Sequence, residues 1–179
     1  MSIIEKARKF AIEAHGQQVR KYTGEPYWHH CQAVAELVAS TGADTDTVAA
    51  AWLHDTVEDC EVDVATIGNV FNGRIAMFVY YLTDTPKGYG NRRERKDRDV
   101  NRLATAPAPV QTIKLADLID NTSSIVEHDP QFAKLYLAEK RTLLSVLTKG
   151  NSDLYSRAFE LAHQNYTGTA SEGRMAAAS

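Results

Sequence analysis

The stretch Trp52-Leu53-His54-Asp55-Thr56-Val57-Glu58-Asp59 brings one imidazole and three carboxylates together within eight residues. It overlaps the end of the apolar run from Val48 to Leu53, which is long enough for a buried helix. Carboxylates at the end of a buried helix cost stability unless they are paired or bind a cation. On a continuous helix, His54 would share a face with Glu58, and Asp55 with Asp59. The stretch therefore indicates a metal-binding or proton-transferring site, although an acidic helix end is also compatible with a solvated surface.

The composition is that of an ordinary globular domain. With 179 residues, 44% hydrophobic and 24% charged, the chain fits one domain with a substantial core. No apolar run approaches the ~20 residues that span a bilayer, and the N-terminus lacks the pattern of a signal peptide, so we expect a cytoplasmic protein without membrane attachment. A net charge of −3 argues against a partner that is a nucleic-acid polymer. Cys31 and Cys60 show no CxxC spacing, which favours reduced packing residues.

Apolar periodicity and capping residues predict helices along the whole chain, whereas strand signals are almost absent. We expect an all-α, single-domain multi-helix bundle of eight or nine helices over residues 1–165, and a disordered tail over residues 166–179. The expected helices lie at Ser2–His15, from about Tyr27 to Thr41, from about Asp46 through the octet, and at Asp63–Phe71, Arg74–Leu82, Arg92–Leu103, Val110–Val126, Pro130–Leu147 and Ser152–Gln164.

Two further potential metal ligands stand on other expected helices. His30 lies near the start of the second helix, and Asp117 interrupts the apolar pattern of the helix from Val110 to Val126. Together with His54 and Asp55, they would supply two imidazoles and two carboxylates. Such a mixed nitrogen and oxygen set suits Mn²⁺, Fe²⁺, Co²⁺ or Zn²⁺ better than a thiolate or all-oxygen site does.

The order His, His-Asp, Asp resembles the HD superfamily of metal-dependent phosphohydrolases, and within it the hydrolase domain of RelA/SpoT-type enzymes. Because no further domain follows in the sequence given, the stand-alone small alarmone hydrolases (the MESH-like branch) are the closest resemblance. Motif register favours His30 over His29 as the first ligand. The resemblance rests on Gly16-Gln17 with Arg20-Lys21, Gly24-Glu25-Pro26-Tyr27 with His30, His54-Asp55-Thr56-Val57-Glu58-Asp59, Asn91-Arg92 with Glu94-Arg95-Lys96, and Lys114-Leu115-Ala116-Asp117 with Asn121.

The resemblance implies an HD-domain fold and a role for each matching residue. His30, His54, Asp55 and Asp117 match the metal ligands, and Mn²⁺ is the family's usual ion. Glu58 and Asp59 match the catalytic acidic pair that orients water and moves protons. Six further residues match substrate-binding positions: Arg20 and Lys21 on the guanosine nucleotide, Asn121 on its sugar side, and Arg92, Lys96 and Tyr136 at the pyrophosphate end.

The implied reaction removes the 3′-pyrophosphate from (p)ppGpp, the guanosine tetra- or pentaphosphate alarmone, and yields GDP or GTP and pyrophosphate. Two departures from the family pattern stand near the ligands: Cys31 follows His30 where relatives usually have proline, and Asp120 stands where many have a basic or aromatic residue. Alternatives are an HD phosphohydrolase acting on another phosphorylated nucleotide or metabolite such as NADPH, or a non-catalytic alarmone-binding module. A homo-oligomer is left open.

Overall fold

The computed structural model describes residues 1–164, and within them the chain is all-helical. Its helices are α1 (Ile3–His15), α2 (Trp28–Ser40), α3 (Thr45–Leu53), α4 (Thr56–Asp59), α5 (Val64–Val70), α6 (Gly73–Leu82), the 3₁₀ helix η1 (Lys87–Tyr89), α7 (Arg92–Thr105), α8 (Ala108–His128), α9 (Pro130–Leu144) and α10 (Ser152–His163). Among these residues no strand forms, and one isolated antiparallel bridge joins Val19 and Pro26. The all-α prediction is confirmed.

The octet differs from its prediction, because it does not lie on one continuous helix. The chain leaves α3 at His54, and Asp55 precedes the separate short helix α4. His54 therefore follows the last residue of α3 while Glu58 lies on α4, which adds a helix to the eight or nine expected. The predicted disordered tail, residues 166–179, lies outside the described residues. No helix among the described residues is long and apolar enough to cross a membrane.

Helix α3 lies at the centre of the N-terminal half. Every residue from Thr47 to Leu53 is buried, and α3 contacts α1, α2, α6 and α8. Three consecutive alanines, Ala49 to Ala51, allow neighbouring helices to approach closely, and the Asp44 side chain caps the first turn by accepting from the Thr47 amide at 2.9 Å. The buried helix α3 therefore carries His54, which follows its last residue, into the core.

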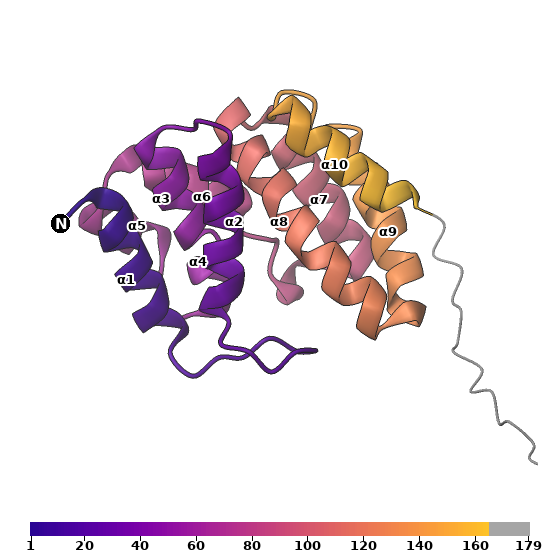
Figure 1. Ribbon diagram of the computed structural model, residues 1–179, viewed down its shortest axis with the longest axis horizontal. Helices are drawn as coiled ribbons and strands as arrows, with labels where there is room; N and C mark the ends of the chain where they lie inside the picture. Colours follow the sequence, from indigo (N-terminus) through magenta and orange to yellow (C-terminus); the bar gives the residue numbers. More distant parts are fainter. Residues whose placement is uncertain (165–179) are drawn as a thin grey trace, which may run out of the picture.

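Helix α8 joins the two halves of the molecule. Figure 1 shows α1 to α6 on one side and α7 to α10 on the other, with α2 and α8 adjacent at the junction, and these two helices are in contact. Most of the first half of α8 is buried, including Ile113, Leu115, Ala116 and Asp117. A buried carboxylate is therefore carried on the helix that packs against α2, which carries His30.

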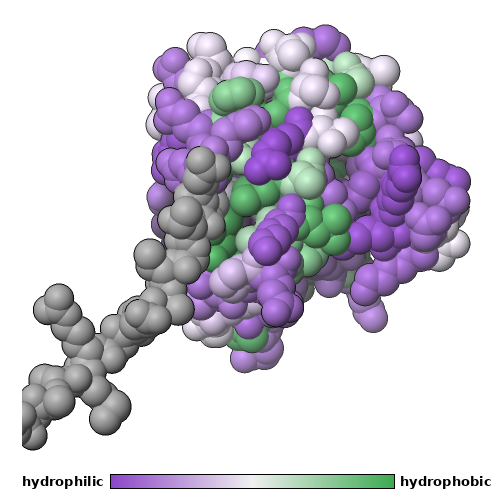
Figure 2. Space-filling view, turned by 90° about the vertical axis from the view of Figure 1, so that its right-hand side faces the viewer, coloured by the Kyte–Doolittle hydropathy of each residue, from purple (hydrophilic) through white to green (hydrophobic). Residues whose placement is uncertain are grey.

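The face formed by α9 and α10 leaves apolar surface uncovered by the described residues. Figure 2 looks at this side of the molecule and shows hydrophobic residues in its centre, with hydrophilic residues around them. Leu135 of α9 and Phe159 of α10 are 48% and 44% exposed. These helices therefore pack inward with one face, as amphipathic helices do, and keep some apolar side chains outside.

Gly150 fits closely against α8, and we expect Gly150→Ala to destabilise the fold. A Cβ atom there would lie 2.6 Å from Leu115 Cδ1 and 3.1 Å from the backbone carbon of Gln111. Such overpacking typically costs ~1–3 kcal/mol. Urea unfolding measures the change in free energy, and Gly88→Ala is the matched control because nothing lies within 4 Å of its Cβ position. Equal stability of the two variants would contradict the prediction.

Candidate metal centre and active site

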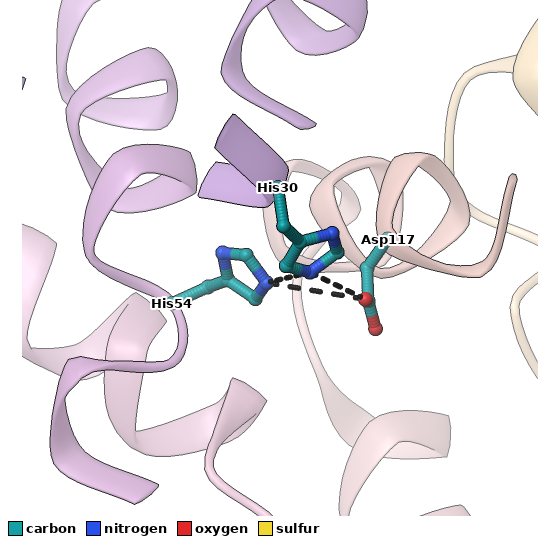
Figure 3. A group of neighbouring side chains, drawn as sticks. All are labelled: His30, His54 and Asp117. Atoms are coloured by element: carbon teal, nitrogen blue, oxygen red, sulfur yellow. Dashed lines mark hydrogen bonds and ion pairs between the residues drawn. The ribbon is translucent and has the colours of Figure 1, made fainter. Parts of the chain in front are cut away.

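The break between α3 and α4 places His54 in the core with one ring nitrogen free. The side chain is 2% exposed, and its Nδ1 lies 2.7 Å from the Ala51 carbonyl oxygen. A carbonyl oxygen only accepts, so Nδ1 carries the proton and donates it. The lone pair of the neutral ring is then on Nε2, which points toward His30 (Figure 3).

His30 is held in the same way from α2. It is 1% exposed, and its Nδ1 lies 2.7 Å from Oδ2 of Asp120 on α8. An ionised carboxylate also only accepts, so His30 donates from Nδ1 and keeps its lone pair on Nε2. The two Nε2 atoms lie 3.2 Å apart. Two lone pairs facing each other at this distance repel unless a positive charge lies between them.

Two carboxylates complete the cluster. Asp117 Oδ1 lies 3.3 Å from His30 Nε2, and Asp55 Oδ2 lies 3.1 Å from His54 Nε2 and 3.4 Å from His30 Nε2. One ligand atom from each of His30, His54 and Asp117 lies within 4.8 Å of the other two, and Figure 3 shows these three side chains converging from separate elements. All the converging atoms can act as acceptors, so the cluster favours positive charge, either a bound cation or a proton.

The donor set and its spacing fit a divalent metal ion. Ligand bonds of about 2.0–2.1 Å at angles near 90–110° put neighbouring ligand atoms about 3 Å apart, as the Nε2 atoms are. Burial opposes a proton on His30, but hydrogen bonds to Asp117, Asp120 and Asp55 raise its pKa well above the ordinary value. Positive charge is thus strongly favoured at this point, and imidazole with carboxylate suits a first-row divalent ion.

Two side chains of α8 bind the Asp117 carboxylate directly. Asn121 donates from Nδ2 to Asp117 Oδ1 at 2.6 Å, and Lys114 Nζ lies 2.8 Å from Asp117 Oδ2. The sequence motif predicts a substrate contact for Asn121 and no role for Lys114. The spacings i−3 and i+4 around a buried aspartate on a helix were the available signal. Lys114 therefore offsets part of the negative charge that Asp117 brings to the cluster.

Three further side chains contact the predicted ligands or their partners: Tyr27, Asp120 and Arg20. The Tyr27 hydroxyl donates to Asp55 Oδ2 at 2.7 Å, and Arg20 pairs with Asp120, which also accepts from His30. Arg20 Nη2 lies 3.2 Å from Asn121 Oδ1. Arg20 therefore lies beside the predicted ligands, while its assignment to the nucleotide stays a prediction. The sequence motifs predict no role for Tyr27, and Asp120 stands out in them only as a departure from the family pattern.

A cavity of about 750 Å³ opens beside the cluster. Its wall includes Asp55 and Asp117 and five of the eight residues predicted for catalysis or substrate binding: Glu58, Arg92, Lys96, Asn121 and Tyr136. The two cations among these five residues already have carboxylate partners. Arg92 Nε lies 2.7 Å from Glu139 Oε1, and Lys96 pairs with Asp84. An anionic ligand in the cavity would compete with these carboxylates.

Glu58 stands at the cavity with a carboxyl group suited to proton transfer. It accepts from the backbone amide of Asp84 at 3.0 Å. Withdrawal of the carboxyl group from water, together with the charges of Asp84 and Asp55, raises the pKa of Glu58 to about 7, although the side chain as a whole is exposed. A group with a pKa near 7 can both accept and release a proton at neutral pH.

Asp59 and Lys21 are not among the residues that line the cavity. Asp59 is exposed and accepts from Gln18 Nε2 at 3.0 Å. The Lys21 side chain is 75% exposed, donates to the Tyr22 hydroxyl at 3.1 Å and lies 3.7 Å from Asp129. Their catalytic and nucleotide-binding roles stay predictions.

The raised pKa of Glu58 predicts a pH-dependent effect of Glu58→Gln on stability. The pKa of about 7 in the folded protein exceeds the ordinary glutamate pKa of 4.5, so the stabilising protonated form is lost as the pH rises through 7. In metal-free protein, we expect the variant to melt at a higher temperature than the unaltered protein at pH 8 and at a similar temperature at pH 5. Solvent screening will reduce the size of this difference. If the melting temperatures of the variant and the unaltered protein differ equally at pH 5 and pH 8, the prediction is contradicted.

The geometry agrees with a protein family. A model of the HD domain matches residues 7–147, which is more than half of the chain. The chain belongs to the HD-domain family. In this HD domain, His54 and Asp55 are the adjacent His-Asp pair, and His30 and Asp117 are brought to them from α2 and α8.

Curated relatives resemble this HD domain at the level of sequence. It is 39% identical over 123 residues to the guanosine-3′,5′-bis(diphosphate) 3′-pyrophosphohydrolase of Aquifex aeolicus, covering 68% of this chain and 18% of that protein. It is 32% identical over 149 residues to a probable enzyme of the same description from Synechocystis. That match covers 81% of this chain and 20% of the Synechocystis protein. The expected resemblance to RelA/SpoT-type hydrolases is confirmed, and the HD domain spans about a fifth of these relatives.

Solved structures share the fold. The structure of a metazoan ortholog of SpoT that hydrolyses ppGpp superposes with a TM-score of 0.81 at 24% identity, covering 90% of this chain and 94% of that chain. A protein of Listeria monocytogenes EGD-e superposes with a TM-score of 0.67 at 25% identity. The superposition covers 79% of this chain and 96% of the Listeria chain. The helical arrangement of the HD domain is thus the same as in known structures.

Proposed function

We propose that this HD domain hydrolyses the 3′-pyrophosphate of (p)ppGpp and releases GDP or GTP and pyrophosphate. The observation that carries the proposal is the convergence of His30, His54, Asp55 and Asp117 on one point beside a cavity that contains Glu58 and several cations. The named activity of the Aquifex aeolicus relative supports the choice of substrate. The proposed domain covers residues 1–165, and its substrate is a small anionic nucleotide.

The metal is proposed to be Mn²⁺, held by the two Nε2 atoms and the two carboxylates. When bound, a divalent cation supplies Lewis acidity, which polarises a phosphoryl oxygen and acidifies water. His30 and His54 keep their Nε2 lone pairs available because Asp120 and the Ala51 carbonyl accept from their Nδ1 groups. Asp117 and Asp55 bring the negative charge that balances the ion.

Glu58 is proposed as the group that moves a proton at the cavity. Its Oε2 is oriented by the Asp84 amide, and its pKa of about 7 lets it accept a proton from water and return it to the leaving oxygen. Asp59 is proposed as its partner, positioned by Gln18. Arg92 and Lys96 are proposed to exchange their carboxylate partners for phosphate oxygens of the substrate. The two cations would thereby hold the scissile group near Asp117.

The experiment combines purified protein with Mn²⁺ and ppGpp and resolves the products by ion exchange. We expect GDP and pyrophosphate in equal amounts, with turnover that depends on added metal. A panel that includes pppGpp, NADPH and other phosphorylated nucleotides, compared by kcat/KM, separates this reaction from a related phosphohydrolase. Tight binding of ppGpp without products, by folded and metal-loaded protein, would instead favour a binding module.

A further inference from the structure

Among the described residues that line the cavity, Lys140 is the cation that is buried, whereas Arg92 is exposed and Lys96 and Lys114 are half-buried. Arg92, Lys96 and Lys114 each have a carboxylate within ion-pair distance. Lys140 is 1% exposed, and among the described residues no carboxylate lies within 4.0 Å of its ammonium group. A buried charge without a counter-charge is costly, so the residue stands in an unfavourable position unless a ligand supplies that charge.

Two uncharged oxygens of α8 hold the Lys140 ammonium in place. It donates to the Leu118 carbonyl and to the Thr122 hydroxyl. An ammonium group has three N–H donors, so one remains for another acceptor. Burial lowers the pKa of Lys140 to about 7, and nearby Lys114 lowers it further while Asp117 opposes this. An anion in the cavity would restore the charged form.

Tyr136 presents a second unsatisfied group on the same face of α9. It precedes Lys140 by four residues, and the Lys140 Nζ atom lies 5.6 Å from the centre of its ring. Its hydroxyl oxygen is buried and has no hydrogen-bond partner among residues 1–164. A buried hydroxyl without a partner loses the free energy of its hydration, which a ligand oxygen can replace.

We propose that Lys140, together with Tyr136, forms an anion-binding subsite in the wall of the cavity, which takes a phosphate or pyrophosphate group. One anionic oxygen there provides the counter-charge for Lys140 and accepts from both side chains. The nearest charged groups on the facing helix are Asp117 and Lys114, which pair with each other at 2.8 Å. The subsite rests on the proposed function only in identifying the ligand as a nucleotide.

The test measures binding of inorganic pyrophosphate to metal-loaded protein by calorimetry. Lys140→Met keeps the length of the side chain and removes the charge, and we expect it to weaken binding by about tenfold or more while the metal content stays unchanged. Lys140→Arg should retain part of the affinity. Lys134→Met is the matched control, because Lys134 is an exposed lysine of the same helix, and its affinity should equal that of the unaltered protein.

A second measurement needs no variant. The unaltered protein is acetylated with acetic anhydride with and without pyrophosphate, and the rate at each lysine is read by mass spectrometry. Pyrophosphate should slow the reaction at Lys140 and leave Lys134 unaffected. Unchanged affinity of Lys140→Met, or unchanged labelling of Lys140, would overturn the proposal. Failure of ppGpp hydrolysis would remove the proposed reaction but not this result, because the probe is pyrophosphate itself.

Discussion

Replacing Asp117 with asparagine is expected to lower the affinity of the protein for Mn²⁺ by more than about 100-fold. Asp117 contributes one of the two carboxylates at the cluster, and its Oδ1 lies 3.3 Å from His30 Nε2. The asparagine keeps the volume of the side chain but removes the charge that balances the ion. Calorimetry with Mn²⁺ and the metal content after dialysis both measure the change.

The matched control is Asp120→Asn, which changes the same residue type one turn along α8. Asp120 accepts from His30 Nδ1 and from Arg20 but does not converge on the cluster. Its loss should weaken metal binding by ~10- to 100-fold, the range typical of groups that orient a ligand. A weaker effect at Asp117 than at Asp120 would show that the ion binds elsewhere.

Glu58→Gln is expected to reduce kcat for ppGpp hydrolysis by ~10²- to 10⁴-fold while the metal stays bound. The amide can still accept from the Asp84 backbone, so the local structure is kept. It cannot accept or release a proton, which is the role that a pKa of about 7 suits. Pyrophosphate release under saturating ppGpp measures kcat, and metal analysis of the same sample confirms occupancy.

Glu61→Gln is the control for this substitution. Glu61 is exposed and stands three residues further along, beyond the end of α4. It should keep the full rate. Turnover by Glu58→Gln at the rate of the unaltered protein would exclude Glu58 as the proton-transfer group and leave the metal-dependent reaction to another residue, for which Asp59→Ala is the next variant.

The sequence by itself determined most of the helices, because their signals are local. Helices α1 and α3 begin close to the starts expected at Ser2 and at about Asp46, and they are capped by the Ser2 and Glu5 capping box and by the Asp44 side chain. The sequence motifs also pointed to the four side chains that converge in the structure, His30, His54, Asp55 and Asp117. The split at His54 and Asp55 was not predicted, because a favourable apolar and acidic pattern gives no local signal against one continuous helix.

Only the tertiary structure decided how these side chains work together. Tyr27 on Asp55, Asp120 on His30 and Lys140 on α8 join residues 18 to 90 positions apart, and such contacts exist only once the helices pack. The paired or unpaired state of each cavity cation is likewise a matter of packing. Burial and neighbouring charge set the pKa values of Glu58 and Lys140, and packing decides which donors are left without an acceptor. The residue type alone encodes neither.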